Sequence, residues 1–423
     1  MATQDLPLRL PSCRQAVAAL QANTAVQKAL SQIEAQAGRR IEEQIALTET
    51  PAPSFAEEER ARLFKLLLEK AGLPDVHFDA VGNVIGRMKG TGSGPVLVIG
   101  AHLDTVFPAG TEIKVRQEGT RYFAPGISDD ACGLANLLQV VRAITENGIR
   151  PTGDIVFVGT LGEEGNGDLR GSKALWKAEN DYDGFIAVDS ASPKRILKGS
   201  VGCKRFRITY TGPGGHSLHK FGIVGSAAHA LCRAGAMIAD LNAPKEPKCT
   251  YNIGVIKGGT SVNAIAATAS MELDVRSYEQ GALETFVSEI LPIFQKAADA
   301  ENRHWGVAGE AAVTVTVDAI GDRPAGMNPA DSPVVCAAYE AMTALNIPLE
   351  KFTLGATDQN IPLSMGYPAT TLGGGGAEEN NHSLKEVWDA ADAHLGPQLV
   401  MLTALALVGA DGVSQPVLAK HRH

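Results

Sequence analysis

Two adjacent aspartates, Asp129 and Asp130, lie in a glycine-flanked segment at 126–133, directly before an apolar helical pattern over 134–144. Adjacent carboxylates repel each other unless a positive charge lies beside them or water separates them. Most such pairs belong to solvated surface turns, which is the ordinary alternative here. The acidic and imidazole groups elsewhere in the chain favour a cation-binding role instead.

Three continuous apolar runs are each followed at once by acidic or imidazole side chains. Such runs are typical of parallel strands covered on both faces, and ligands bind at the carboxyl ends of these strands. Core packing does not explain charged groups at the same end of three strands. The runs and the residues after them are 95–100 with His102 and Asp104, 154–160 with Glu163 and Glu164, and 184–188 with Asp189.

A fourth strand, 369–372, precedes the glycines 373–376 and then His382. Carboxylate oxygens and imidazole nitrogens are ligands of hard and borderline divalent cations. Two metal ions about 3–4 Å apart need one bridging carboxylate and further ligands for each ion. The sequence therefore predicts a dinuclear site whose ligands are His102, Asp129, Glu164, Asp189 and His382.

The predicted chemistry is hydrolysis, with Asp129 between the metals. Metals lower the pKa of a bound water to about 7, and a neighbouring carboxylate must take its proton. Glu163 is the expected general base, because it precedes a ligand by one residue. Asp104 and Asp130 are expected to orient His102 and the site by hydrogen bonds. A cis bond between Asp129 and Asp130 would direct both carboxylates suitably.

Composition narrows the functional classes. A net charge of −9 makes nucleic acid an unexpected partner, and no apolar run approaches the roughly 18 residues that span a membrane. Six scattered cysteines without a Cys-x-x-Cys motif argue against a disulfide framework and indicate a reducing, cytoplasmic compartment. Met1–Arg14 has no apolar core of a signal peptide, and 420–423 is expected to be a solvated tail.

The chain is long enough for two domains, and its patterns predict an interrupted one. Residues 15–48 have helical periodicity, and Ser54 with Glu57 is typical of a capping box for the next helix. After residue 199 the order becomes β-α-β-β-α-β, a ferredoxin-like split motif. The expected parts are a catalytic domain over 1–199 and 323–423, and an inserted domain over 200–322.

The sequence resembles the dinuclear zinc hydrolases that include peptidase T, glutamate carboxypeptidase, aminoacylase, acetylornithine deacetylase and succinyl-diaminopimelate desuccinylase. The resemblance covers nearly the whole chain, and five weak motifs in family order make it specific. It implies the metal roles given above, two zinc ions, and a mostly parallel αβα catalytic domain with an inserted lid that dimerises. The motifs are 102–105 (His-Leu-Asp-Thr), 126–133, 162–165 (Gly-Glu-Glu-Gly), Asp189 and 382–383.

The resemblance also implies roles for residues of the inserted domain. His216, in the glycine-rich loop 212–217, matches the histidine that reaches the partner's active site and holds the oxyanion. Asn263 matches a substrate-contacting asparagine, and Arg276 matches an arginine that binds a substrate carboxylate, as a planar bidentate donor can. The segment 355–360 resembles the substrate loop of the same family.

Ordinary structural roles stand beside these assignments. Asp189 could cap a helix, His216 could end a glycine loop, Asn263 could be a turn residue, and Arg276 could form a surface ion pair. The chain also departs from the family pattern. Ala131-Cys132 follows the paired aspartates where many relatives have lysine or methionine, and 263–266 lacks the proline that is common there. Asp189 stands where carboxypeptidase-type relatives tend to have glutamate.

We expect an enzyme that cleaves an amide bond in a small peptide, as a peptidase T-like aminopeptidase or other exopeptidase. An N-acyl amino acid deacylase or a carboxypeptidase of the same family remains open, and so do cobalt and manganese in place of zinc. The expected assembly is a homodimer through the lid domain. The alternative outside enzymes is a non-catalytic dimeric binding protein, which a missing ligand or a missing Glu163 would favour.

Overall fold

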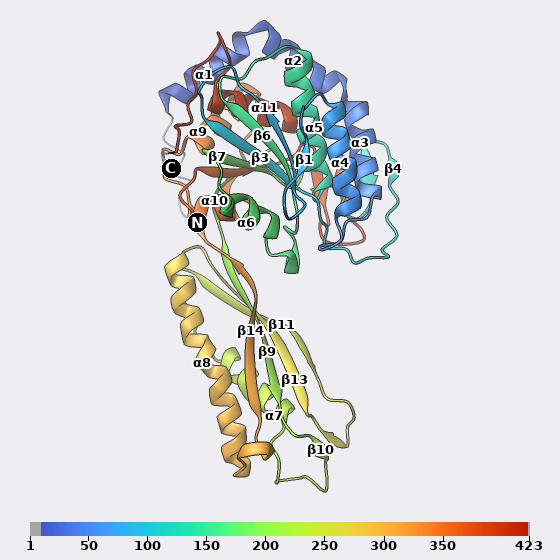
Figure 1. Ribbon diagram of the computed structural model, residues 1–423, viewed down its shortest axis with the longest axis vertical. Coiled ribbons are helices and arrows are strands. Elements are labelled where there is room, and N and C mark those ends of the chain that lie inside the picture. Colours follow the sequence, from blue (N-terminus) through green and yellow to red (C-terminus); the bar gives the residue numbers. More distant parts are fainter. Residues whose placement is uncertain (1–9, 422–423) are drawn as a thin grey trace. The chain divides into compact units, whose positions relative to one another are not determined.

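A computed structural model describes residues 10–421 of the chain. Contacts divide the chain into two compact units, which Figure 1 draws in full and which we describe separately. The first unit comprises 1–200 and 327–423, and the second comprises 201–326. The sequence placed the second boundary at 322, but the last strand of the second unit continues to Arg323. The expectations for Met1–Arg14 and 420–423 fall partly on residues outside the described range.

The first unit is built from helices and strands that alternate along the chain. Its helices are α1 Pro11–Ala22, α2 Thr24–Ala35, α3 Ala37–Glu49, α4 Glu58–Lys70, α5 Ala131–Glu146, α6 Arg170–Lys177, α9 Pro333–Ala344, α10 Asn360–Ser364 and α11 Leu395–Val408. Its strands are β1 His77–Phe78, β2 Val84–Met88, β3 Val96–His102, β4 Arg116–Glu118, β5 Arg121–Phe123, β6 Asp154–Thr160, β7 Gly184–Val188, β8 Arg195–Ser200, β15 Gly326–Met327, β16 Lys351–Gly355, β17 Ala369–Leu372, β18 Ala377–Glu379 and β19 Val387–Asp389.

The main sheet has the strand order β1-β2-β6-β3-β7-β17-β8-β15, and β16 pairs with β8. The central pairs β6–β3, β3–β7 and β7–β17 are parallel, whereas β2–β6 and β17–β8 are antiparallel. The parallel strands all end at one edge of the sheet. That edge receives the acidic and imidazole side chains that the sequence places after β3, β6 and β7.

Both faces of this sheet are covered by apolar side chains, which explains why its strands are continuous apolar runs. In β3, Leu97 and Ile99 belong to a core shared with α1, α2, α4, α5, α9 and α11. The alternate residues Val96 and Val98 belong to a second core, shared with α6 and α10. Successive side chains of a strand face opposite sides, so the unit has three layers. This confirms the predicted α/β fold class.

A small second sheet of the first unit has the order β18-β19-β5-β4. Its strands are only three residues long, and the sequence analysis did not predict them. The strands matter because of the loops they hold. The segment 124–130 follows β5 and contains Asp129, and the turn between β18 and β19 contains His382.

The second unit has the predicted β-α-β-β-α-β order. Its antiparallel sheet has the order β11-β13-β9-β14, and its helices pack on Phe206, Ile208 and Tyr210 of β9 in one apolar core. A short pair, β10 with β12, is formed within this motif by the segments between β9 and α7 and between β11 and β13. The elements are β9 Gly202–Thr211, β10 Gly215–His216, α7 Ala227–Ala239, β11 Cys249–Gly258, β12 Ala264–Ile265, β13 Thr268–Ser277, α8 Gln280–Trp305 and β14 Thr314–Arg323.

Two local predictions were wrong. The segment 15–48 forms three helices instead of one, because Asn23 ends α1 and its Oδ1 accepts hydrogen bonds from Ala25 N and Val26 N of α2. Ser54 does not cap α4, whose N-cap is Glu57. Ser54 Oγ donates instead to Asp104 Oδ2, at 2.6 Å. Among residues 10–421, none of the helices has the length and apolarity that crossing a membrane requires.

A buried ion pair joins two helices that pack behind the sheet. Arg142 of α5 donates through both Nη atoms to the Glu43 carboxylate of α3, at 2.9 and 2.7 Å. The side chains are 1% and 11% exposed. Replacing one partner leaves the other charge buried without compensation, so we expect Glu43→Gln to lower the free energy of unfolding by about 3 kcal/mol.

Urea unfolding of Glu43→Gln against the parent protein measures this cost. The exposed neighbour Glu42 provides the matched control, because Glu42→Gln changes the same charge at the protein surface. It is expected to alter the unfolding free energy by less than about 0.5 kcal/mol. Equal stability of Glu43→Gln and the parent protein would show that the pair contributes nothing.

Candidate metal centre

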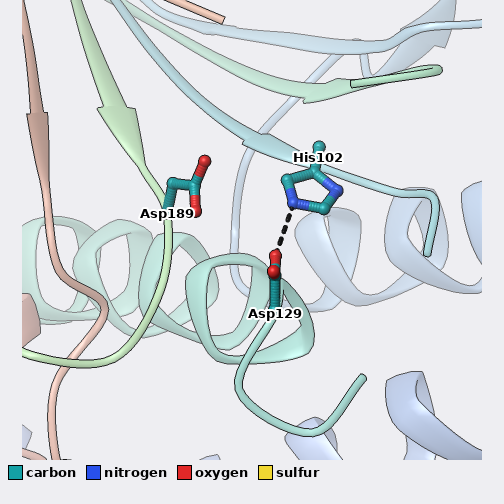
Figure 2. A group of neighbouring side chains, drawn as sticks. All are labelled: His102, Asp129 and Asp189. Carbon is teal, nitrogen blue, oxygen red and sulfur yellow. Dashed lines mark hydrogen bonds and ion pairs between the residues drawn. The ribbon is translucent and has the colours of Figure 1, made fainter. Parts of the chain in front are cut away.

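Parallel strands position most of the candidate ligands. His102 is the last residue of β3, Asp189 directly follows β7, and Glu163 and Glu164 follow β6 after a two-residue turn. These strands are neighbours in the sheet, so their ends bring the side chains together. Figure 2 shows His102, Asp129 and Asp189 directed toward a common space.

Asp129 reaches this space from the start of a helix. Asp130 is the N-cap of α5, and its Oδ1 accepts from Gly133 N at 3.0 Å. Its Oδ2 accepts from His102 N, also at 3.0 Å. The bond between Asp129 and Asp130 is cis, as the sequence analysis expected. Asp130 thus holds the backbone of His102, and Asp129 is left to face the site.

The two oxygens of the Asp129 carboxylate face two different imidazoles. Oδ1 lies 2.9 Å from His102 Nε2, and Oδ2 lies 3.0 Å from His382 Nε2. His382 Nε2 also lies 2.9 Å from Glu164 Oε1. A carboxylate placed in this way can bridge two cations.

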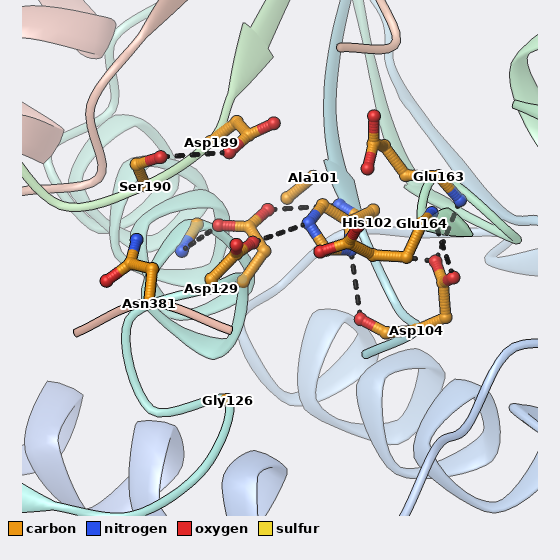
Figure 3. Close-up of polar contacts among 12 residues, drawn as sticks. Ala101, His102, Asp104, Gly126, Asp129, Glu163, Glu164, Asp189, Ser190 and Asn381 are labelled. Atoms are coloured by element: carbon orange, nitrogen blue, oxygen red, sulfur yellow. Dashed lines mark hydrogen bonds and ion pairs between the residues drawn. The ribbon is translucent and has the colours of Figure 1, made fainter. Parts of the chain in front are cut away.

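Ligand atoms converge in overlapping sets (Figure 3). One set is His102, Asp129 and Asp189, and another is Asp129, Glu164 and His382; within each set the ligand atoms lie within 4.8 Å of one another. Asp129 is common to both. Glu163 and Glu164 form a third such set with His102, so Glu163 lies beside the candidate ligands.

The tautomer of His102 suits metal binding. Its Nδ1 lies 3.0 Å from the backbone oxygen of Asp104, so this nitrogen carries a proton and donates it. A proton fixed on Nδ1 leaves Nε2 available as a ligand. Burial lowers the pKa of His102, but the acidic groups of Asp104 and Asp129 outweigh it and raise the pKa well above its ordinary value.

The charges of the site also favour the binding of cations. Burial raises the pKa of Asp189 to about 7, and the negative charge of Asp129 adds to this effect. Burial likewise raises the pKa of Asp130. Hydrogen bonds to Asp129 and Glu164 raise the pKa of His382 to about 11. Clustered acids hold protons in this way when they exceed the positive charge nearby. Divalent cations would supply that charge, so the residues fit a dinuclear metal centre.

Asp104 acts on the loop that carries the two glutamates. Its Oδ1 accepts from Glu163 N at 2.8 Å, and its Oδ2 accepts from Glu164 N at 3.1 Å. Burial raises the pKa of Asp104, but His102 outweighs it, and hydrogen bonds from Ser54 and from Glu163 N add to the effect, so the pKa lies below its ordinary value. Asp104 was also expected to orient His102. Its backbone oxygen accepts from His102 Nδ1 at 3.0 Å, and its Oδ1 lies 3.6 Å from the same nitrogen.

Two glutamates that the sequence analysis missed hold further loops of the site. Glu386, which is 1% exposed, accepts from backbone N–H groups around Asp129. Glu378 accepts from Ala191 N, two residues after Asp189. They lie on or directly before β18 and β19, whose short length gave no periodic signal. The one signal in the sequence that could have identified them is their position, because Glu378 precedes His382 and Glu386 follows it.

The glycines before His382 allow close backbone packing. A Cβ on Gly374 would lie 2.7 Å from Cys132 Sγ, and one on Gly373 would lie 2.1 Å from the Ser192 oxygen. Arg40 Nη2 donates to Cys132 Sγ at 3.2 Å, but burial raises the pKa of this thiol to about 12. Cys132 therefore stays protonated and serves as packing beneath the site.

The segment 355–360 is largely buried, although the sequence suggested a substrate loop. Thr357 Oγ1 lies 2.8 Å from Thr371 Oγ1, and Gln359 Nε2 donates to the Gly199 oxygen at 2.9 Å. Thr160, the last residue of β6, donates through its hydroxyl to Asp358. These contacts anchor the segment within the first unit, next to strand β6, which leads to Glu163.

The remaining predicted site residues lie in the second unit, and only two of them lie close together. His216 pairs with Ala264 in the β10–β12 ladder, and Ser217 N donates to the Asn263 oxygen at 3.0 Å. Both His216 and Asn263 line a groove of about 670 Å³. Arg276 lies eight residues from Thr268, the first residue of β13, which is about 26 Å at 3.3 Å per residue. Arg276 Nε donates to Asp274 Oδ2 at 2.6 Å.

Known proteins are similar to this chain in sequence or in fold. Carboxypeptidase G2 from Pseudomonas sp. (strain RS-16) is 30% identical over 203 residues, which cover 46% of this chain and 47% of that protein. The chain thus matches about half the length of this relative. Aminopeptidase PepT from Bacillus cereus has a TM-score of 0.69 at 22% identity, covering 88% of this chain and 98% of that one.

A dinuclear metal-binding peptidase, YXEP from Bacillus subtilis, has a TM-score of 0.64 at 19% identity, covering 89% of this chain and 99% of that one. At identities this low, the similarity to these solved structures establishes the fold alone. The family model for peptidase family M20/M25/M40 matches residues 98–407, which include all the candidate ligands. The chain therefore belongs to peptidase family M20/M25/M40 and is a hydrolytic enzyme of the metallopeptidase and amidohydrolase class.

Proposed function

We propose that this enzyme is an exopeptidase that cleaves an amide bond in a small peptide, in the manner of a peptidase T-like aminopeptidase. The observation that carries the proposal is the Asp129 carboxylate, whose oxygens face His102 and His382 separately, with Glu163 beside the same cluster. A substrate carbonyl would bind above this cluster, at the carboxyl edge of the parallel strands.

The proposed ligands divide into two sets that share Asp129. His102 and Asp189 complete one set, and Glu164 and His382 complete the other. Zinc suits the nitrogen and oxygen donors, and cobalt or manganese could also occupy them. When bound, the two cations would acidify a water molecule and polarise the carbonyl oxygen of the substrate.

Glu163 is proposed as the group that moves the proton. Its carboxylate takes a proton from the attacking water and returns it to the leaving amine, which departs as a neutral group. The hydrogen bond from Glu163 N to Asp104 supports this role, because it fixes the backbone from which the side chain extends. Glu163 is only 5% exposed, so the proton transfer would take place largely out of bulk water.

The second unit is proposed to complete the site in a homodimer. His216 and Asn263 lie together on one groove, which supports a joint role in holding a partner's substrate. His216 would donate a hydrogen bond to the developing oxyanion. Arg276 is proposed to bind a substrate carboxylate; its side chain is 42% exposed and is held at Nε by Asp274.

Carboxypeptidase activity is the second candidate, and the similarity to carboxypeptidase G2 favours it. An arginine that binds a free carboxylate would serve either a carboxypeptidase or an N-acyl amino acid deacylase. The three activities share one bond-breaking step. They differ in which end of the substrate is free, so a panel of tripeptides, acyl-glutamates and N-acetyl amino acids separates them.

Glu163→Gln tests the proton-transfer role. Glutamine keeps the shape of the side chain but cannot accept the proton, so we expect kcat to fall at least about 100-fold with KM little changed. Metal content, measured by mass spectrometry on the same samples, is expected to stay at the parent value. Near-parent kcat in a metal-loaded Glu163→Gln protein would exclude Glu163 as the base.

His216→Ala tests whether one subunit contributes to the site of its partner. Loss of one oxyanion donor is expected to lower kcat by about 100-fold to 1,000-fold. Mixed dimers of His216→Ala with Glu163→Gln would then regain activity, because one of the two sites would have both residues intact. Activity that stays absent in verified mixed dimers would place His216 and Glu163 in the same subunit's site.

A further inference from the structure

Glu386 has a bonding pattern that points to a role in the metal centre. Its Oε1 accepts from Ser128 N at 2.9 Å, from Ser128 Oγ at 2.6 Å and from Asp129 N at 3.1 Å. Its Oε2 accepts from Gly126 N at 2.9 Å. One carboxylate therefore receives four donors, three of them backbone amides, and one of these belongs to Asp129 itself.

The same glutamate is tied to the loop of the second histidine. Glu386 N donates to the Ser383 oxygen at 3.1 Å, in the loop between β18 and β19 that contains His382. Ser128 Oγ also lies 3.3 Å from Asn381 Oδ1, next to His382. Glu386 thus joins two loops that are remote in sequence. One carries the shared carboxylate, and the other carries the imidazole that faces Oδ2 of that carboxylate.

This arrangement constrains the direction of the Asp129 side chain. The backbone over 126–129 has little freedom to rotate, because the N–H groups of residues 126, 128 and 129 all donate to one buried carboxylate. The Asp129 side chain extends from a residue whose own N–H makes one of these bonds. Groups that orient metal ligands in this way tune metal affinity and reactivity without touching the metal.

We propose that Glu386 is a positioning residue that fixes the angle at which Asp129 bridges the two cations. This inference rests on the proposed function, because it assumes that Asp129 is the shared ligand. The carboxylate group is required for its ability to accept at both oxygens. An amide accepts at one atom and donates at the other, so it cannot replace all four bonds.

Glu386→Gln is the direct test, because it keeps the side-chain size and removes only the second acceptor. Its nitrogen would face either Gly126 N–H or the donors at Ser128 and Asp129. The matched control is Glu379→Gln on the neighbouring strand β18. Glu379 Oε2 pairs with Arg121 at 2.8 Å, and its side chain is 62% exposed, so this change removes the same charge from the same small sheet.

Three measurements besides turnover test the positioning role. In the metal-free protein, hydrogen exchange at amides 126–130 is expected to quicken in Glu386→Gln and to stay at the parent rate in Glu379→Gln. Titration with zinc is expected to show affinity weakened about 10-fold to 100-fold. The visible spectrum of the cobalt-loaded variant is expected to differ from that of the parent, because it reports ligand geometry. Turnover is expected to fall mainly in kcat.

Glu386→Asp keeps the charge but shortens the side chain, so it serves if the glutamine variant fails to fold. It is expected to show the same changes in exchange, affinity and spectrum. Parent-like values of all three in a folded variant would overturn the inference. Failure of the proposed function is distinguishable, because the parent protein itself would then bind fewer than two metal ions.

Discussion

The metal centre depends on one constraint, which is that several buried carboxylates must share a small volume. Asp129, Glu163, Glu164 and Asp189 gather around two imidazoles, and burial raises the pKa of Asp189 to about 7. The like charges of these groups repel one another, and hydrogen bonds with His102 and His382 offset the charge of Asp129. Two divalent ions would offset these charges, and the two oxygens of Asp129 face His102 and His382 separately.

The rest of the first unit holds these side chains in place. His102 and Asp189 lie at the carboxyl ends of parallel strands, and Asp129 directly precedes Asp130, the N-cap of α5. Around them, acidic side chains accept backbone N–H groups from the loops of the site: Asp104 from the Glu163 loop, Asp130 from His102, Glu378 from the Asp189 loop, and Glu386 from the Asp129 loop. These bonds fix the backbone of His102, Glu164 and Asp129 and the loop that follows Asp189, and the side chains of these residues are left to face the site.

The sequence predicted the parts of this arrangement that are local. Apolar runs with charged residues at their ends identified β3, β6 and β7, and through them His102, Glu164 and Asp189. It failed where a distant partner decided the outcome. Ser54 resembled a helix cap, but Asp104 competes for its hydroxyl. Glu386 bonds to amides 260 residues away in the chain, and its strand is too short for a periodic pattern. The breaks at Asn23 and Gln36 escaped notice because the apolar periodicity continues across them.

The central claim is that Asp129 bridges two metal ions. Anomalous X-ray diffraction from crystals of the zinc-loaded enzyme, measured on both sides of the zinc absorption edge, tests it most directly. The account predicts two anomalous peaks about 3–4 Å apart, each about 2.0–2.2 Å from a different oxygen of Asp129. A single peak, or two peaks with Asp129 bound to only one of them, would contradict it.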